Sequence, residues 1–130
     1  MGYNFNANSI LATPLKKRTA PVLTQAWKKL HNKYTQAAVA PQMYILDNEF
    51  SQELENALVK ENCKSQLVPR NAHMNILAER AIQTWKSHFK AGLETCDSDF
   101  PLREWDRLIE QANITLNFLR SSRSNPKLSA

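Results

Sequence analysis

The sequence predicts an α/β fold in which short strands alternate with amphipathic helices. Short, mostly apolar runs at Ser9–Ala12, Met43–Leu46 and Gln66–Val68 have the length of strands. Longer segments between and after these runs repeat apolar residues at helical spacing, which is typical of helices that bury one face. Because 130 residues have room for one core, we expect one domain over residues 1–121 and a flexible tail over residues 122–130.

The first half of the chain predicts a strand, a helix and a second strand. The strand at Ser9–Ala12 ends before Pro14, and Pro21 is favoured in a first helical turn. After Pro21 the apolar residues fall on one helical face; they are Leu23, Ala26, Trp27, Leu30, Tyr34 and Ala37. Pro41 ends this region, and the apolar run Met43–Leu46 predicts a strand buried on both faces.

The second half predicts a short helix, a third strand and two longer helices. Ser51 can cap the short helix, and Gln66–Val68 is the strand, which we expect to pair with Met43–Leu46 in one sheet. The next helix spans about Ile76 to Leu93, and its predicted core face consists of Leu77, Ala78, Ala81, Ile82, Trp85 and Phe89. The last helix, about Leu102 to Ser121, is apolar on more than one side, which predicts deeper burial than a surface helix has. The tryptophans lie on apolar faces, so we interpret them as core anchors and not as platforms that stack on bases: Trp27, Trp85 and Trp105.

The charge and the cysteine content narrow the class of protein. A net charge of +5 and a pI near 9.4 suit a polyanionic partner such as nucleic acid, although many basic proteins bind none. Cys63 and Cys96 are too few for a disulfide scaffold, and no residues at zinc-ligand spacing surround them. We interpret both as reduced thiols of an intracellular protein in the nucleus or cytoplasm. No apolar run approaches membrane-spanning length and the N-terminus lacks the apolar segment of a signal peptide, so we expect no membrane partner.

Two carboxylates stand in positions that suit metal binding. Asp47 follows the apolar run that ends at Leu46, and Glu79 lies near the start of the helix that begins at about Ile76. An aspartate at a strand's end and a glutamate on a later helix can meet at one point, where they would hold a divalent metal for phosphoryl transfer. The spacing alone does not show this, because a strand-end acid and a solvated helix acid give the same pattern.

The segments around these acids resemble the integrase catalytic core of retroviruses and LTR retrotransposons, of the copia-like kind. The resemblance runs from about Asn8 to Ala130, and its segments occur in the family's order: Leu46–Glu49, Gln66–Pro69, Ala78–Ile82, Phe100–Asp106, Asn113–Asn117 and Asn125–Ala130. It implies a ribonuclease H-like core, in which helices flank a mixed sheet. It also implies a polynucleotidyl transferase that uses Mg²⁺ or Mn²⁺ for DNA end processing and strand transfer, the reactions of DNA integration.

The resemblance assigns roles to the two acids. Asp47 and Glu79 match two of the family's three catalytic, metal-binding acids. The family's first strand carries the third acid and would lie upstream of Tyr3, so we expect an N-terminally truncated core with the first strand or strands missing. Without the bridging acid, Mg²⁺ should bind weakly and this chain alone should be inactive. The alternative is a non-catalytic nucleic-acid-binding or self-associating domain derived from an integrase.

The same helix carries the candidate DNA contacts. Steps of four, three and four residues place one row on one helical face: Glu79, Gln83, Lys86 and Lys90. In the family, basic residues on this face contact the DNA end, which makes element ends and target DNA the expected partners; a solvated helix face is an equally weighted alternative. Arg70 and His73, in the preceding loop, match a region that contacts phosphate, although a lone loop histidine more often faces solvent. Self-association as a homo-oligomer is a further expected partnership.

A second basic concentration lies in the first third of the chain. It comprises Lys16, Lys17, Arg18, Lys28, Lys29 and Lys33. We interpret it as a basic turn followed by the charged outer face of a helix. A charged face of this kind needs no ligand, because solvated lysines are ordinary on the exposed side of an amphipathic helix.

Overall fold

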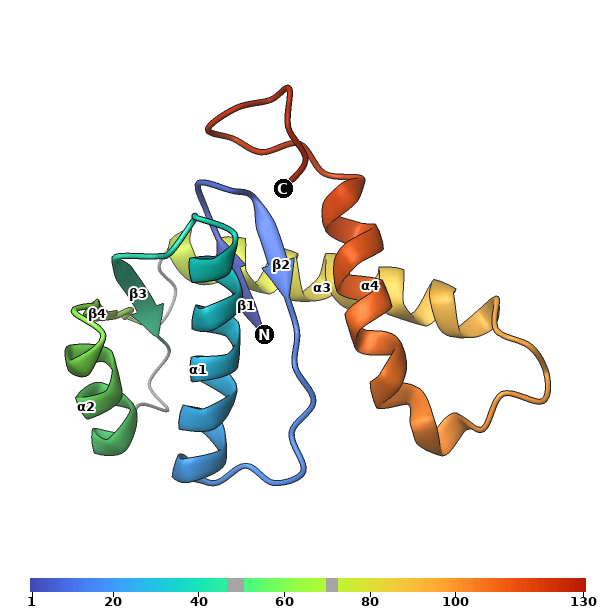
Figure 1. Cartoon of the computed structure of the whole chain (residues 1–130), viewed down its shortest axis with the longest axis horizontal. Helices are drawn as coiled ribbons and strands as arrows, with labels where there is room; N and C mark the ends of the chain where they lie inside the picture. Colours follow the sequence, from blue (N-terminus) through green and yellow to red (C-terminus); the bar gives the residue numbers. More distant parts are fainter. Residues whose placement is uncertain (47–50, 70–72) are drawn as a thin grey trace. The chain divides into compact units, whose positions relative to one another are not determined.

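The computed structural model describes residues 1–46, 51–69 and 73–130, the side chains of residues 73–75 excepted, and its elements confirm the α/β class (Figure 1). The described chain divides into two compact units, residues 1–14 with 79–130 and residues 15–78. In chain order the elements are β1 (Gly2–Asn4), β2 (Ser9–Leu11), α1 (Ala20–Gln36), β3 (Met43–Leu46), α2 (Gln52–Lys60), β4 (Lys64–Leu67), α3 (His73–Glu94), the 3-10 helix η1 (Leu102–Arg107) and α4 (Leu108–Phe118).

The unit that contains both chain ends begins with a hairpin. Strands β1 and β2 pair antiparallel, with Gly2 opposite Leu11 and Asn4 opposite Ser9. Asn8 closes the turn with a φ of 59°, a left-handed conformation that asparagine adopts more readily than most residues. The Asn4 side chain accepts a hydrogen bond from the Ala7 backbone N–H at 3.0 Å, so the turn is held by its own polar side chains.

Two asparagines of α4 bind the outer edge of β2. The Asn117 amide accepts a hydrogen bond from the Ile10 N–H and donates one to the Ile10 carbonyl, both at 2.8 Å. The Asn113 amide pairs in the same way with Ala12, at 3.0 and 2.9 Å. Asn113 and Asn117 are four residues apart, which separates them by about 6 Å along the helix axis. Ile10 and Ala12 are two residues apart, which separates them by about 6.6 Å along an extended chain, so each amide lies opposite one backbone position. Side chains of α4 therefore take the place of a third strand beside β2.

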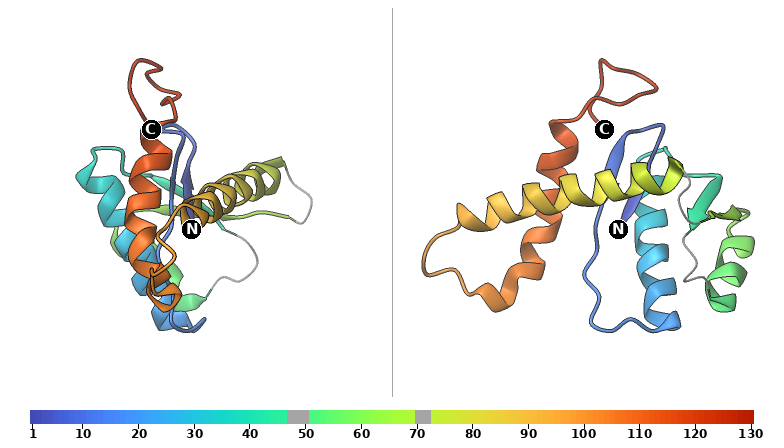
Figure 2. Two further views of the ribbon diagram at one scale, coloured as in Figure 1. Left: turned by 90° about the vertical axis from the view of Figure 1, so that its right-hand side faces the viewer. Right: turned by 180° about the vertical axis from the view of Figure 1, so that it is seen from behind.

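The core of this unit forms where α4 crosses α3 (Figure 2). Its buried residues come from β2, α3, α4 and the residue after β2: Ile10, Ala12, Ala81, Trp85, Ile109, Ala112 and Leu116. Trp85 stacks on Phe89 with ring centroids 4.9 Å apart, and its indole N–H donates to Asn113 at 2.9 Å. His88 adds a second polar link between the helices through the Thr115 hydroxyl, at 2.8 Å. These contacts confirm that the Ala81, Trp85 and Phe89 side of α3 faces a core.

The last helix differs from the sequence expectation in two ways. The segment from Leu102 to Arg107 is a 3-10 helix and α4 ends at Phe118, so the predicted single helix was wrong. Burial on several sides was also wrong, because Ile114 and Phe118 are 62% and 76% exposed. They lie about 200° around the helix from Leu116, which faces the core.

Trp105, predicted to anchor the core, is 44% exposed. Its ring meets only the edge of the Phe89 ring among the aromatic contacts of the described residues, with centroids 6.2 Å apart. It lies within η1, where the sequence pattern had placed a continuous helix. In a 3-10 helix three residues complete a turn, so a stripe spaced for an α-helix no longer shares one face. Trp85, on the regular helix α3, is buried as predicted.

The C-terminal residues, expected to form a flexible tail, fold back on the same unit. Ser121 and Ser129 form an isolated antiparallel bridge, and the Ser122 N–H donates to the Leu128 carbonyl at 2.9 Å. The Arg123 and Ser124 N–H groups both donate to the Asn6 carbonyl, at 3.1 Å each. These hydrogen bonds attach the tail to the end of α4 and to the turn between β1 and β2.

The unit formed by residues 15–78 contains a parallel strand pair and two helices. Strands β3 and β4 pair from Met43 opposite Lys64 to Leu46 opposite Leu67, which confirms the predicted pairing. The core joins α1, α2, β3 and the segment before β4, and consists of Trp27, Ala57, Leu58 and Cys63, with Tyr44, Leu46 and Leu54 packed against it. Ser51 caps α2 as expected, because its hydroxyl accepts a hydrogen bond from the Leu54 N–H at 3.3 Å.

One expectation for the strands was wrong in the described residues, and a second is not confirmed. We expected β3 to be buried on both faces, but Met43 and Ile45 are 51% and 40% exposed. Tyr44 and Leu46, on the other face, contact the core that the helices cover. The expected mixed sheet of a ribonuclease H-like core stays a prediction, because the strands of the described ranges form two two-stranded sheets.

Candidate nucleic-acid interface

The predicted row on α3 lies on one exposed face. Burial of Ala81 and Trp85 fixes which side of the helix faces the core. Residues spaced by three or four positions stay in a narrow stripe, because successive residues turn by about 100°. The four residues of the row are all exposed, as the sequence predicted: Glu79, Gln83, Lys86 and Lys90.

The side chains of this row are available to a ligand. Lys86 and Lys90 form no ion pair with any residue in the described parts of the chain, and Glu79 and Gln83 form no side-chain hydrogen bond there. An ammonium group is only a donor, whereas the glutamine amide both donates and accepts. Two ammonium groups about 6 Å apart along the helix axis can each meet a phosphate oxygen. The row is therefore suited chemically to a phosphate backbone.

Of the two acids predicted to bind metal, only one lies within the described residues. Glu79 is exposed on α3, whereas Asp47 lies outside the described residues. Within residues 1–46, 51–69 and 73–130, no group of three or more His, Cys, Asp or Glu side chains is arranged to hold a metal. Mg²⁺ needs near-octahedral oxygen ligation and loses water reluctantly, so one exposed carboxylate does not form a magnesium site. The described residues alone do not fit the ion, and we derive no catalytic step through it.

The side chains of the two loop residues expected to contact phosphate are not among those described. Arg70 lies outside the described residues. His73 is the first residue of α3, but its side chain lies outside the description. Their contacts with phosphate therefore stay predictions.

An aromatic cluster that the sequence pattern did not indicate lies between α1 and β3. His31 stacks on Trp27 with ring centroids 5.2 Å apart, and its Nδ1 lies 2.8 Å from the Tyr44 hydroxyl. Burial, and secondarily the nearby Cys63 thiol, raises the pKa of Tyr44 above its ordinary value of 10.0. Burial also raises the pKa of the Cys63 thiol. A protonated, buried thiol is a poor nucleophile, so we assign this cluster to packing.

Comparison with known proteins assigns no family to this chain. No protein-family model matches the chain, and a search of curated proteins finds no match to it. No helix of the described residues is long and apolar enough to cross a membrane. A function for the chain is therefore argued from its residues and their arrangement.

Proposed function

We propose that this chain is a DNA-binding domain derived from an integrase catalytic core. The observation that carries the proposal is the exposed row on α3, where Gln83, Lys86 and Lys90 follow Glu79 on one face. Glu79 stands at the position that the resemblance assigns to a catalytic acid. A cationic face beside that acid is suited to hold the DNA backbone, since phosphate contacts supply most sequence-independent affinity for DNA.

The order of the elements supports a ribonuclease H-like arrangement. The antiparallel pair β1 and β2 precedes α1, and the parallel pair β3 and β4 is joined through α2. This order of strands and helices is the one that the resemblance to integrases implies for the later part of a ribonuclease H-like core. We include this fold in the proposal because the same segments carry the resemblance to integrases.

The proposal treats this chain by itself as binding without catalysis. Asp47 and Glu79 would hold Mg²⁺ or Mn²⁺, which in two-metal sites activates the attacking oxygen and stabilises the leaving one. The 130 residues match two of the family's three acids. Paired ions about 3.5–4 Å apart need a carboxylate that bridges them, so two acids should bind metal weakly. Glu79 then acts on DNA chiefly through its negative charge.

Exposed apolar residues favour self-association as a second candidate function. On α4 and its C-terminal end, Ile114, Phe118 and Leu119 are 62%, 76% and 77% exposed. Large apolar side chains grouped on a surface are typical of contacts between proteins. Association would be compatible with DNA binding, because these residues lie on a different helix from Lys86 and Lys90.

Titration of salt against DNA affinity tests the main proposal. The wild type should bind a 30-base-pair duplex weakly and without sequence preference, and log K should fall steeply with log salt. The double variant Lys86→Glu and Lys90→Glu should lower that slope by about 2, because each lost phosphate contact contributes about 0.9. The matched control is Lys60→Glu with Lys64→Glu, which makes the same charge change at two exposed positions. Equal losses in the two variants would contradict a specific α3 face, provided that circular dichroism shows both to be folded.

A further inference from the structure

The net positive charge of this chain comes from its first third. Residues 1–46 contain six Lys or Arg and no Asp or Glu. Residues 47–130 contain eleven Lys or Arg and twelve Asp or Glu. The first segment therefore carries +6 and the remainder −1, which together make the net +5. Charge that merely keeps a protein soluble is normally mixed in sign along the surface. An acid-free segment of this length instead indicates a surface for an anionic partner.

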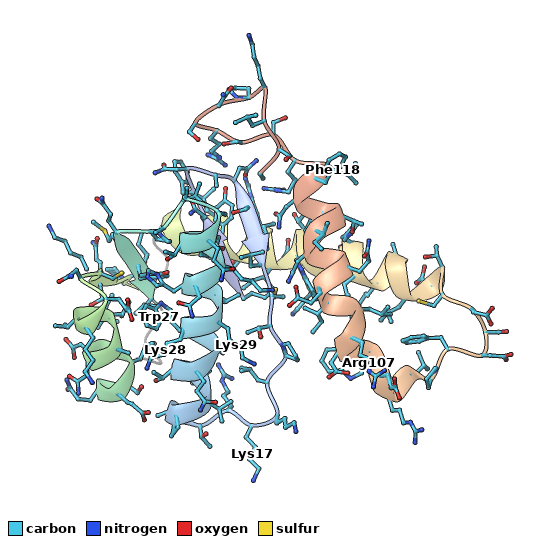
Figure 3. All side chains as sticks on the ribbon, viewed as in Figure 1. Lys17, Trp27, Lys28, Lys29, Arg107 and Phe118 are labelled. Atoms are coloured by element: carbon cyan, nitrogen blue, oxygen red, sulfur yellow. The ribbon has the colours of Figure 1, made fainter. Side chains whose placement is uncertain are left out.

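The structure gathers this charge on one helix and the turn before it. Lys16, Lys17 and Arg18 precede α1, and Lys28, Lys29 and Lys33 lie on it. Four of these six side chains are exposed lysines with no ion pair among the described residues: Lys16, Lys17, Lys28 and Lys29. In Figure 3 the Lys17 side chain extends away from the ribbon near the beginning of α1, and Lys28 and Lys29 are on the helix itself.

The orientation of the basic face is fixed by the packing of the other side. Trp27, Leu30 and Tyr34 are buried, with exposures of 7%, 8% and 3%. Trp27 packs against α2 residues and Tyr44 in the core of the unit. Because these side chains hold one side of α1 inward, Lys28 and Lys29 must face outward. The lysines of α1 thus lie on the side of the helix opposite its buried residues.

The polar residues between the lysines indicate which anion would be bound. Gln25, Asn32 and Gln36 are exposed on the outward side of α1. Side-chain amides and lysines are the groups that contact phosphates and sugars of nucleic acids without reading bases. A helix that lies on a membrane instead places Trp, Phe or Leu into the lipid beside its lysines. The large apolar side chains of Trp27, Leu30 and Tyr34 on α1 are buried, which favours nucleic acid over a lipid surface.

The length of the surface also suits nucleic acid. Helix α1 has 17 residues, which correspond to about 25 Å at about 1.5 Å per residue. Duplex DNA presents one phosphate per about 1.7 Å of axis, or about fifteen over that length. The exposed lysines extend from Lys16, before α1, to Lys29 near its middle, so they can contact several phosphates of a single bound duplex.

We infer that the outer face of α1, with the Lys16–Arg18 turn, is a second nucleic-acid-binding surface that contacts the phosphate backbone without sequence preference. It belongs to the unit of residues 15–78, whereas Lys86 and Lys90 belong to the other unit. The inference does not rest on the DNA-binding role of α3. It goes beyond the proposed function by assigning binding to residues that the integrase resemblance leaves without a role.

Charge reversal on each surface separates the two assignments. The variants are Lys28→Glu with Lys29→Glu, Lys86→Glu with Lys90→Glu, and the control Lys60→Glu with Lys64→Glu. The control lies in the same unit as α1 and makes the same charge change. With the 30-base-pair duplex, the α1 variant should lower the slope of log K against log salt by about 2, and the control should change it by much less. Lys28→Gln with Lys29→Gln repeats the test with a smaller perturbation of the helix.

Each outcome distinguishes the hypotheses. If the α1 variant binds DNA as well as the control variant does, this inference is overturned. The proposed function still stands in that case if the α3 variant alone loses affinity for DNA. Loss in the α1 variant alone supports this inference and contradicts the α3 face. Equal loss in all three variants overturns both, because generic attraction then explains binding. Wild-type binding to phosphatidylserine vesicles that is tighter than binding to DNA, and lost in the α1 variant, would assign the surface to lipid and overturn the inference.

Discussion

The asparagine ladder between α4 and β2 offers a direct test of how this fold is held together. Asn117→Leu keeps the size of the side chain but removes both hydrogen bonds to Ile10. Ile10 is 1% exposed, so water cannot replace the lost partners without local opening. The third bond of Asn117, to the Asn113 carbonyl, lies within the helix and matters less, because a helical carbonyl keeps its backbone partner.

The expected loss of stability follows from the Ile10 N–H and C=O groups, which lose their partner in Asn117→Leu. A buried N–H or C=O without a partner costs about 1–3 kcal/mol, so two of them cost about 4 kcal/mol. Burial of the leucine side chain offsets about 2 kcal/mol of this. We therefore expect Asn117→Leu to lower the free energy of unfolding of this unit by about 2 kcal/mol, which is about a 30-fold change in its equilibrium.

Amide hydrogen exchange can measure this effect at the strand itself. The Ile10 amide should exchange about 30-fold faster in Asn117→Leu. The Ala12 amide, which Asn113 holds, should exchange faster to the same extent if the whole unit opens, and less than the Ile10 amide if only the edge near Ile10 opens. Gln111→Leu is the control on an exposed position of α4, and it should leave both amides unchanged. If the Ile10 amide stayed as protected in Asn117→Leu as in Gln111→Leu, the side-chain amide would not be what holds the edge of β2.

Alkaline pH is expected to destabilise the unit formed by residues 15–78. The pKa values of Tyr44 and Cys63 are raised by burial, from ordinary values of 10.0 and 9.0, so the folded unit holds these protons while the unfolded chain releases them. The corresponding stability is complete below pH 9 and is lost progressively as the pH rises above 9 and then 10. Thermal unfolding between pH 7 and 11 should show a shallower alkaline loss in Tyr44→Phe, and identical slopes would contradict the assignment. Glu79→Gln should tighten DNA binding a few-fold, since it removes repulsion between this carboxylate and phosphate; weaker binding would argue for a positive role of the acid. In a strand-transfer assay with Mn²⁺, neither the wild type nor Glu79→Gln should form product, and product from the wild type alone would refute binding without catalysis. Phe118→Ser should shift any oligomer toward monomer in sedimentation, and an unchanged distribution would remove this residue from the contact.

Much of the candidate site could be predicted because it depends on the geometry of one helix. The spacing of Glu79, Gln83, Lys86 and Lys90 places them in one stripe wherever α3 lies. The core side of α3 could be predicted for the same reason, since Trp85 and Phe89 share the opposite stripe. The predicted proximity of Asp47 and Glu79 depends on tertiary structure, because the two residues are far apart in the chain. It stays a prediction, since Asp47 lies outside the described residues.

The aromatic contacts of the other unit could not be predicted from periodicity. His31 lies next to Tyr44 because α1 packs on β3, and neither residue's own helix or strand pattern indicates that neighbour. The acid-free stretch is present in the sequence, but its grouping on the outside of α1 depends on which side of the helix Trp27 buries. Local pattern therefore identified the buried faces of α1 and α3, but it failed where burial depends on another element, as at Trp105, Ile114 and Phe118.

The sequence by itself determined the α/β class, the approximate positions of α1, α2 and α3, the Ser51 cap and the pairing of Met43–Leu46 with the strand that ends near Val68. These features depend on hydrogen bonds and apolar repeats within short segments, which neighbouring residues specify. Tertiary structure alone decided that Asn113 and Asn117 complete the edge of β2, because a buried amide acquires a role only when a strand more than 100 positions away supplies its partners. It also decided that Ile114 and Phe118 stay exposed, since an apolar side chain is buried only where another element covers it.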